Sequence, residues 1–301
     1  MDNPVIKDLI KLKLIKTKNF ELISKKVRNG NTNVYRDKFT KVIFLKKNLV
    51  SKDYYKKKYE KFNIKNNKFG KFTFEKINNR YIKLETINDD LRRYLHLKKY
   101  LTKKKIILDY GCGKLNFLNI LKKKNINSNQ IFGLEKNEII LNKSKSDKSF
   151  ILKNNLDNFR MKFDIVTMFH VLHYLPDQIS ALKEVFNKLN KNGKIFIEVP
   201  NAQDVLFSLK TFTDFTLCKE SLVWHTEDSI KKFLKLAGFR KIKIRYIQRF
   251  RLSNHLYWLI QGRPGGHSKF KNLYDERMEF MYIKQLIKNK FTDTLWVEGI
   301  K

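Results

Sequence analysis

The most informative stretch of this 301-residue sequence is KIILDYGCGKLNFL, residues 105–118. Its apolar start predicts a buried strand that ends at the acid Asp109, and a tight turn then passes through Gly111 and Gly113. An apolar helical face begins two residues later. A strand that enters a helix through glycines leaves bare backbone at the helix N-terminus, where a ligand can lie close. The stretch therefore predicts a ligand site at the end of a strand.

Strand-like and helix-like segments alternate after this turn. Further strands are predicted at residues 130–135, 150–152, 163–169, 194–199 and 241–247, and a late helix at residues 229–237. An amphipathic helix at residues 86–103 leads into the first strand. This alternation is typical of a parallel sheet with crossover helices, so we expect an α/β, doubly wound fold.

Ligands of a doubly wound sheet bind beyond the carboxyl ends of its strands. The residues expected at those ends are Asp109 with Gly111 and Gly113, Glu135, Asn155 with Leu156, and Phe169 with His170. Glu135 stands where a dinucleotide-binding fold keeps an acid for the ribose hydroxyls. The alternative for this residue is an exposed acid in a turn.

A nicotinamide dinucleotide is the competing cofactor. Its fingerprint requires a third glycine three residues after the second, and Asn116 occupies that position. The carboxylate of Asp109 would also repel a pyrophosphate, whereas it suits a ligand that carries an ammonium group and a sulfonium. The turn therefore favours a cationic ligand.

A second distinctive segment is RLSNHLYWLIQGRPGGH, residues 251–267. It gathers polar and aromatic residues in a chain that otherwise uses lysine at its polar positions, and the candidates for substrate binding are Asn254, His255, Tyr257, Arg263 and His267. The glycine-rich end predicts tight turns. One interpretation is an apolar helix followed by an exposed loop. The functional interpretation is a lid over an acceptor, in which Arg263 binds a phosphate.

The glycine turn resembles the first motif of the class I S-adenosylmethionine-dependent methyltransferases, in which an apolar run is followed by Asp-x-Gly-Cys-Gly. The resemblance implies a Rossmann-like, seven-stranded sheet and S-adenosylmethionine as cofactor. It implies that Asp109, Gly111 and Gly113 hold the methionine part and Glu135 the ribose. It also implies that residues 155–157 flank the adenine and that Phe169 and His170 line the floor of the pocket.

The C-terminal segment resembles a group of these methyltransferases linked to sugar and cell-surface polysaccharide synthesis, which carries Asn-His-Leu-Tyr-Trp-Leu and Gly-x-Pro-Gly-Gly-His. The group's usual glycine after Gly-Cys-Gly-x is Leu115 here, a change expected to narrow the cofactor pocket. Its usual Glu-His after the fourth strand is His173-Tyr174. The resemblance implies a sugar or nucleotide-sugar as acceptor.

Methyl transfer to a hydroxyl or an acidified C–H requires a base with a pKa near neutrality, and histidine is the best candidate. His173 follows the fourth predicted strand, and His225 opens the late helix beside Thr226. Tyr174 is a further candidate. The alternative for each histidine is a hydrogen-bonded structural role.

The net charge of +36 invites a nucleic-acid interpretation, because cationic side chains neutralise phosphates. The excess is mostly lysine and is spread over the whole chain, as a biased genome would produce. Direct recognition of phosphates and bases favours arginine instead. We therefore expect a small-molecule acceptor in preference to nucleic acid.

Other features of the sequence predict the cellular compartment and the division into domains. No apolar run is long enough to span a membrane, no secretory signal begins the chain, and the two cysteines fit a reducing cytoplasm and leave no zinc ribbon or other metal site. Residues 1–80 are predicted to form an extension with a hairpin at residues 33–45 and a helix at residues 51–59. Residues 81–301 form the methyltransferase domain, in which residues 250–270 cover the acceptor.

The sequence thus predicts an enzyme that transfers a methyl group from S-adenosylmethionine to a small polar acceptor, with a sugar or nucleotide-sugar for a surface glycan as the expected class. Two alternatives stay open. One is an RNA methyltransferase, which the charge favours. The other is a non-catalytic protein that binds S-adenosylmethionine, which the changes at Leu115 and His173 favour.

Overall fold

The computed structural model of the chain describes residues 1–51, 54, 73–77, 80–84, 89–102, 104–127, 130–145, 150–266, 269–270 and 272–301. Its centre is a seven-stranded sheet with the strand order β12-β13-β10-β9-β6-β7-β8. The strands are β6 (Ile107–Tyr110), β7 (Ile131–Leu134), β8 (Ile151–Lys153), β9 (Phe163–Phe169), β10 (Leu189–Pro200), β12 (Arg240–Ile247) and β13 (Thr294–Ile300). β13 is antiparallel to both of its neighbours, and the other neighbouring pairs are parallel. The predicted doubly wound α/β fold is confirmed.

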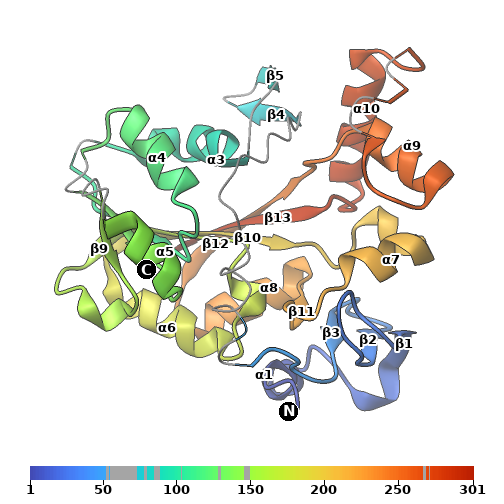
Figure 1. The fold of residues 1–301 in the computed structure, drawn as a ribbon, viewed down its shortest axis with the longest axis horizontal. Helices are drawn as coiled ribbons and strands as arrows, with labels where there is room; N and C mark the ends of the chain where they lie inside the picture. The colour runs from blue at the N-terminus through green and yellow to red at the C-terminus, as the bar shows by residue number, and fades with distance from the viewer. Residues whose placement is uncertain are drawn as a thin grey trace.

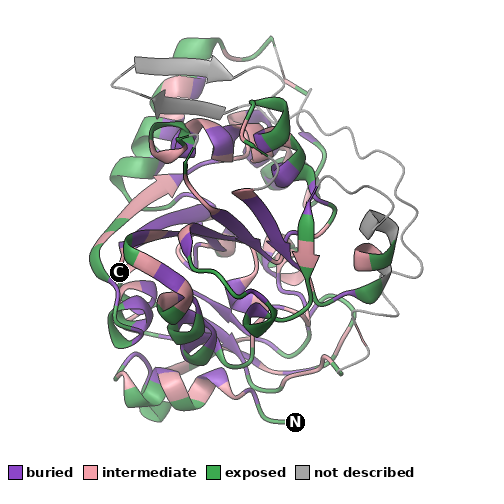
Figure 2. Ribbon diagram, turned by 90° about the vertical axis from the view of Figure 1, so that its left-hand side faces the viewer, coloured by how far each residue is buried: buried purple, intermediate pink, exposed green. Residues whose placement is uncertain are grey.

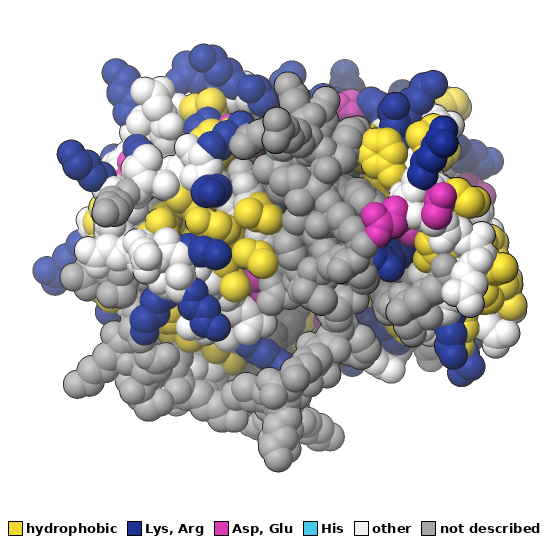
Figure 3. Space-filling view, turned by 90° about the horizontal axis from the view of Figure 1, so that it is seen from above, with side chains coloured by type: hydrophobic (Ala, Val, Ile, Leu, Met, Phe, Trp, Pro, Cys, Tyr) yellow, Lys and Arg dark blue, Asp and Glu magenta, His cyan; other side chains and the backbone are white. Residues whose placement is uncertain are grey.

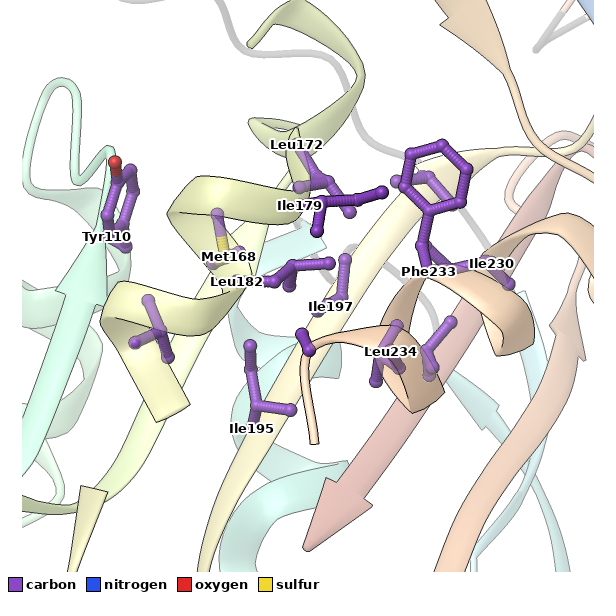
Figure 4. Close-up of a cluster of buried hydrophobic side chains, with 14 of the residues drawn as sticks. Tyr110, Met168, Leu172, Ile179, Leu182, Ile195, Ile197, Ile230, Phe233 and Leu234 are labelled. Atoms are coloured by element: carbon purple, nitrogen blue, oxygen red, sulfur yellow. The ribbon is translucent and has the colours of Figure 1, made fainter. Parts of the chain in front are cut away.

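Helices cover both faces of this sheet (Figure 1). On one face, α3 (Asp89–Leu97) and α4 (Asn116–Lys123) pack on a cluster that includes Ile107, Ile165, Phe196 and Trp296. On the other face, α6 (Gln178–Lys188) and α8 (Glu227–Leu236) pack on a cluster that includes Leu108, Val166, Ile195 and Val297 (Figure 4). Successive side chains of a strand point to opposite faces, so each central strand contributes to both cores.

The N-terminal segment is built onto this core. It forms α1 (Val5–Lys11), β1 (Phe20–Ser24), β2 (Val34–Asp37) and β3 (Ile43–Leu45), and β11 (Val223–Trp224) completes a four-stranded sheet in the order β1-β2-β3-β11. The antiparallel pairing of β2 with β3 confirms the predicted hairpin. Val5 and Leu9 are fully buried in the same cluster as α6 and α8. The division at residue 80 stays a prediction, and most of the expected helix at residues 51–59 lies outside the described residues.

The remaining strands and helices do not belong to these two sheets. They are β4 (Thr73–Ile77) and β5 (Arg80–Leu84), which pair with each other, then α5 (Glu138–Lys145), α7 (Lys210–Thr216), α9 (Leu252–Gln261), α10 (Glu276–Lys288) and the short 3-10 helices η4 (Leu156–Asn158), η5 (Leu172–Tyr174) and η6 (Val205–Ser208). Figure 2 shows buried strands at the centre and exposed residues on the outer faces of the helices. In the part of the chain that the structure describes, no helix has the length and apolarity to cross a membrane.

Truncation of a core side chain on α8 tests this packing. Phe233 is 0% exposed in the cluster beneath the sheet, so Phe233→Ala should lower the free energy of unfolding by about 3–5 kcal/mol through lost burial and a cavity. Urea unfolding followed by circular dichroism measures the change. The control, Phe39→Ala, removes a ring that is 78% exposed and should change stability by less than about 0.5 kcal/mol. Equal midpoints for the two variants would contradict the packing of α8.

Candidate active site

The strand order creates a ligand position at the carboxyl ends of β6 and β9. From β6 the chain proceeds outward to β7 and β8, whereas β9 lies on the other side of β6. The connections that follow β6 and β9 therefore run in opposite directions, which opens a crevice between the ends of these two strands. Asp109 lies in β6, and Thr167 of β9 is its register partner. The fold thus places the predicted glycine turn at the switch in strand order.

The two glycines of the turn have different roles. Gly111 has a φ of +75°, and a Cβ there would lie 2.5 Å from Cγ2 of Val171, so both the conformation and the packing require glycine. Gly113 has a φ of +49° and no atom within 4 Å of a Cβ position, which leaves its backbone open on that side. Its N–H donates to Oε2 of Glu135 at 3.0 Å, and the N–H of Asn137 donates to Oε1 at 2.9 Å. These bonds hold Glu135, the acid expected to bind the ribose, beside the turn.

A cavity of about 170 Å³, called the small cavity below, lies at this turn. It is lined by Asp90, Arg93, Asp109, Gly111, Cys112, Lys114, Asn116, Phe117 and Phe169. Asp109 is 4% exposed and accepts a hydrogen bond of 2.7 Å from Oγ1 of Thr167. Burial raises the pKa of Asp109 to about 7, because its charged form has lost water. A cationic group of a ligand would offset that loss, so the cavity fits an ammonium-bearing cofactor.

Charged residues of α3 form one wall of the small cavity. Glu198 of β10 is 0% exposed and binds Nη2 of Arg92 at 2.5 Å and Nε of Arg93 at 2.6 Å. Burial alone would raise the pKa of Glu198, but the two guanidinium groups outweigh it and hold that pKa below its ordinary value. Arg93 also binds Asp90 at 2.7 Å and lies 4.6 Å from the ring centroid of Phe169. The network fixes Arg93 at the cavity wall.

A second cavity of about 350 Å³, called the large cavity below, lies beyond the ends of β9 and β10. It is lined by Arg28, His170, His173, Tyr174, Pro200, Asn201, Asp204, Phe207, Phe212, Phe215, Thr216, Cys218, Ser221, Trp224, Arg249, Phe250, Asn254, Trp258, Pro264 and Asp293. Phe169 lines the small cavity and its neighbour His170 lines the large one. The end of β9 therefore contributes to the lining of both cavities.

His170, expected on the cofactor floor, belongs to the large cavity. Its φ is +56°, a strained conformation for a residue other than glycine, and its N–H donates to the carbonyl of Glu198 at 2.9 Å. Arg249 can only donate, so Nε2 of His170 accepts from its Nη1 at 3.2 Å and the ring proton lies on Nδ1. Burial, Arg249 and Arg93 lower the pKa of His170 well below its ordinary value. The ring is held neutral.

His173 and Tyr174 also line the large cavity, as their position after the fourth strand predicted. His173 is 1% exposed, and burial lowers its pKa to about 3. Its Nδ1 is buried without a hydrogen-bond partner in the described structure, which leaves it available to a ligand. Such a low pKa makes His173 a weak proton acceptor but a sound hydrogen-bonding group.

His225 has a structural position instead of the expected catalytic one. It is 0% exposed and lines neither cavity. Its Nε2 lies 2.8 Å from Oε1 of Gln178, and its Nδ1 lies 3.0 Å from Oγ of Ser229, the residue that closes the capping box of α8. Both ring nitrogens are therefore used to join α6 to α8. The prediction of a base at His225 is not supported by its geometry.

The C-terminal segment contributes less to the large cavity than expected. Asn254 lines it and keeps Oδ1 buried without a partner in the described structure. His255 instead contacts the hydroxyl of Tyr282 at 2.6 Å and Nε2 of Gln248 at 3.1 Å. Tyr257 and Arg263 do not line either cavity; Arg263 is exposed, with its guanidinium 5.9 Å from the ring of Tyr257. His267 lies outside the described residues.

Three other predicted positions also differ from expectation. Leu115 adopts a φ of +62° at the start of α4, but its side chain packs in the α3–α4 cluster and does not narrow the small cavity. Asn155 caps η4 by accepting from the N–H of Asp157 at 3.2 Å. Leu156 is buried in the opposite core cluster. Asn155 and Leu156 follow β8 at the expected edge, yet neither lines the small cavity.

The sequence interpretation missed the charged residues of the large cavity. Asp204 and Arg249 follow β10 and β12, so their positions after strands were a usable signal. Asp293 precedes β13, and only the antiparallel direction of that strand brings it to the same edge. Arg28 comes from the connection between β1 and β2, and no local sequence pattern predicts its place in the cavity lining.

Comparison with known proteins identifies the fold's relatives. A family model described as a methyltransferase domain matches residues 79–244 of the chain. A tRNA U34 carboxymethyltransferase of Campylobacter fetus subsp. fetus is 30% identical over 117 residues, which are 36% of this chain and 39% of that protein. The match thus spans well under half the length of this curated relative.

Solved structures of methyltransferases resemble the chain as well. A SAM-dependent methyltransferase of Archaeoglobus fulgidus is 19% identical, and the match covers 70% of this chain and 94% of that one with a TM-score of 0.48. A SAM-dependent methyltransferase of Thermotoga maritima is also 19% identical, with coverages of 71% and 95% and a TM-score of 0.44.

The pKa of Asp109 predicts how cofactor binding depends on pH. The carboxyl is protonated below about pH 7 and charged above it, and a cationic ligand binds the charged form. The affinity for S-adenosylmethionine should therefore rise about 10-fold from pH 6 to pH 8 and level off above, as measured by calorimetric titration. Asp109→Asn should weaken binding at pH 8 and remove this dependence, whereas the exposed Asp177→Asn should keep it. An unchanged pH profile in Asp109→Asn would refute the assignment.

Proposed function

The chain belongs to the methyltransferase-domain family and uses S-adenosylmethionine as its methyl donor, and we propose that it methylates a small polar acceptor bound in the large cavity, with a sugar or nucleotide-sugar as the acceptor class. The observation that carries the proposal is the large cavity itself, which His170 lines directly after Phe169 of the small cavity. Its volume of about 350 Å³ is that of a small-molecule site.

The lining of the large cavity supports a ring-shaped polar acceptor. Six phenylalanine and tryptophan side chains supply flat apolar walls: Phe207, Phe212, Phe215, Trp224, Phe250 and Trp258. Asn254 and His173 add buried polar atoms without partners in the described structure, which would bind acceptor hydroxyls. Such groups are costly when unsatisfied, so they favour a ligand that pairs with them. A sugar offers both apolar C–H faces and hydroxyl groups.

The chain's own residues have distinct roles in this reaction. S-adenosylmethionine supplies a methyl group on a positively charged sulfur. Asp109 and the open backbone at Gly113 would hold its methionine part, and Glu135 would bind the ribose. The large cavity would orient the acceptor and exclude water, which is the main contribution that a protein makes to an in-line displacement.

RNA is the alternative acceptor, because the curated relative is named for tRNA and the net charge is +36. On the face drawn in Figure 3, however, Lys and Arg side chains are scattered among apolar and polar ones instead of forming one patch. A cavity of about 350 Å³ also favours a free metabolite over a polymer, unless a base is flipped out.

Transfer of radiolabelled methyl groups tests the two acceptors. The purified protein is incubated with labelled S-adenosylmethionine and, separately, with nucleotide-sugars, sugar phosphates and total tRNA. Label in a sugar fraction supports the proposal, and its rate should change little between about 50 and 200 mM salt. Label in tRNA that falls steeply over the same range would replace the sugar with RNA. Cofactor binding without label in any fraction would indicate a non-catalytic binding protein.

Arg28 gives a site-specific test of acceptor binding. It lies at the exposed edge of the large cavity, where its guanidinium is 4.9 Å from the ring of Phe215, and it would bind a phosphate of the acceptor. Arg28→Ala should raise the KM for a phosphorylated acceptor about 10-fold with little change in kcat. The matched control is Arg263→Ala, which removes an exposed arginine outside both cavities. A KM that responds to Arg263 and not to Arg28 would reverse the assignment.

A further inference from the structure

Asp204 is a buried carboxyl in the large cavity that forms no ion pair among the described residues. It follows the carboxyl end of β10 and is the N-cap of η6, where its Oδ1 accepts from the N–H of Leu206 at 2.9 Å. The side chain is 7% exposed and lines the large cavity. In the part of the chain that the structure describes, no lysine or arginine forms an ion pair with it. A carboxylate in such a position accepts protons readily.

The other carboxyl and the two histidines of the large cavity are less suited to accept a proton. Asp293 accepts from the backbone N–H of Arg249 at 2.7 Å, from its Nε at 2.8 Å and from Oγ1 of Thr294 at 2.5 Å. The Nε2 lone pair of His170 is occupied by Arg249. His173 has a pKa of about 3 and holds a proton too weakly for this role. Asp204 is therefore the carboxyl of the described lining that is left to accept a proton.

The surroundings of Asp204 bring the pKa of its carboxyl close to neutral pH. Burial raises its pKa, and the negative charge of Asp293 raises it further, whereas the N–H of Leu206 and the more distant Arg249 lower it. The balance places the pKa of Asp204 at about 8. The negative charge of Asp204 also contributes to the raised pKa of the phenol of Tyr282 in α10. A general base works best when its pKa lies near the operating pH.

We propose that Asp204 is the general base of the reaction and that the acceptor is accordingly a hydroxyl or an acidified C–H, which must lose a proton. The inference rests on the proposed function, because it assumes that the acceptor binds in the large cavity. As the acceptor atom forms its bond to the methyl carbon, the bond between that carbon and sulfur breaks and its electron pair stays on the sulfur, which becomes a neutral thioether. The acceptor's proton passes to Asp204, which becomes a carboxylic acid and later releases the proton to water.

Asp204→Asn tests the base, because it keeps the shape of the side chain and removes its basicity. The expected result is a fall in kcat of about 100-fold or more with the dissociation constant of S-adenosylmethionine changed less than about 2-fold. In the unaltered protein kcat should rise with pH to an apparent pKa of about 8, and this limb should be absent in the variant. Asp204→Glu should restore part of the rate. The control is Asp214→Asn on α7, which removes an acid paired with Lys210 outside the cavity lining.

A titration without turnover separates this inference from the choice of acceptor. With aspartate labelled by ¹³C in the carboxyl group, one resonance should titrate near pH 8 in the full chain and be absent in Asp204→Asn. Absence of such a resonance, or a variant with the kcat and pH profile of the unaltered protein, would overturn the inference. Label transferred to tRNA instead of sugars would overturn only the sugar acceptor. The pH dependence of kcat would then be compared between the unaltered protein and Asp204→Asn with tRNA as the acceptor, which tests the general base in the same way.

Discussion

Glu198 fixes a residue of each cavity, one through its buried carboxylate and one through its backbone carbonyl. This residue lies near the end of β10 inside the protein, and the guanidinium groups of Arg92 and Arg93 bind its two oxygens, which ties α3 to the sheet. The backbone carbonyl of the same residue accepts the N–H of His170 and holds that residue in its strained conformation. A buried charge is tolerated only when its partners are complete. The network therefore positions Arg93 in one cavity and His170 in the other.

Three buried carboxyls near these cavities have different properties because they have different partners. Glu198 faces two arginines, which keep it ionised. Asp109 has the hydroxyl of Thr167 as its hydrogen-bond donor, and burial lifts its pKa to about 7. Asp204 has one backbone N–H and a neighbouring carboxylate, and its pKa is about 8. The three environments suit a structural anchor, a binding site for a cation and a proton acceptor, respectively.

The N-terminal segment contributes a cationic group to the large cavity. β3 pairs with β11, and Arg28 donates its backbone N–H to the carbonyl of Leu217, which fixes this residue beside α7. Its side chain then reaches the aromatic wall at Phe215. A segment whose local pattern predicts a simple hairpin thus completes a cavity whose other residues come from much later in the chain.

Local patterns in the sequence were enough to predict the strand–turn–helix unit around Asp109, the α/β alternation and the edge of the sheet at which the two cavities lie. Apolar periodicity sets the strands, and the glycines set the turn. The three-dimensional arrangement was needed to show that His225 joins α6 to α8 away from both cavities, that Arg263 lies outside the cavities and that Arg249, Asp293 and Asp204 share one. The direction of β13 and the packing of η6 bring those three together. Their proximity depends on long-range contacts, and local sequence patterns contain no information about which distant side chains will meet.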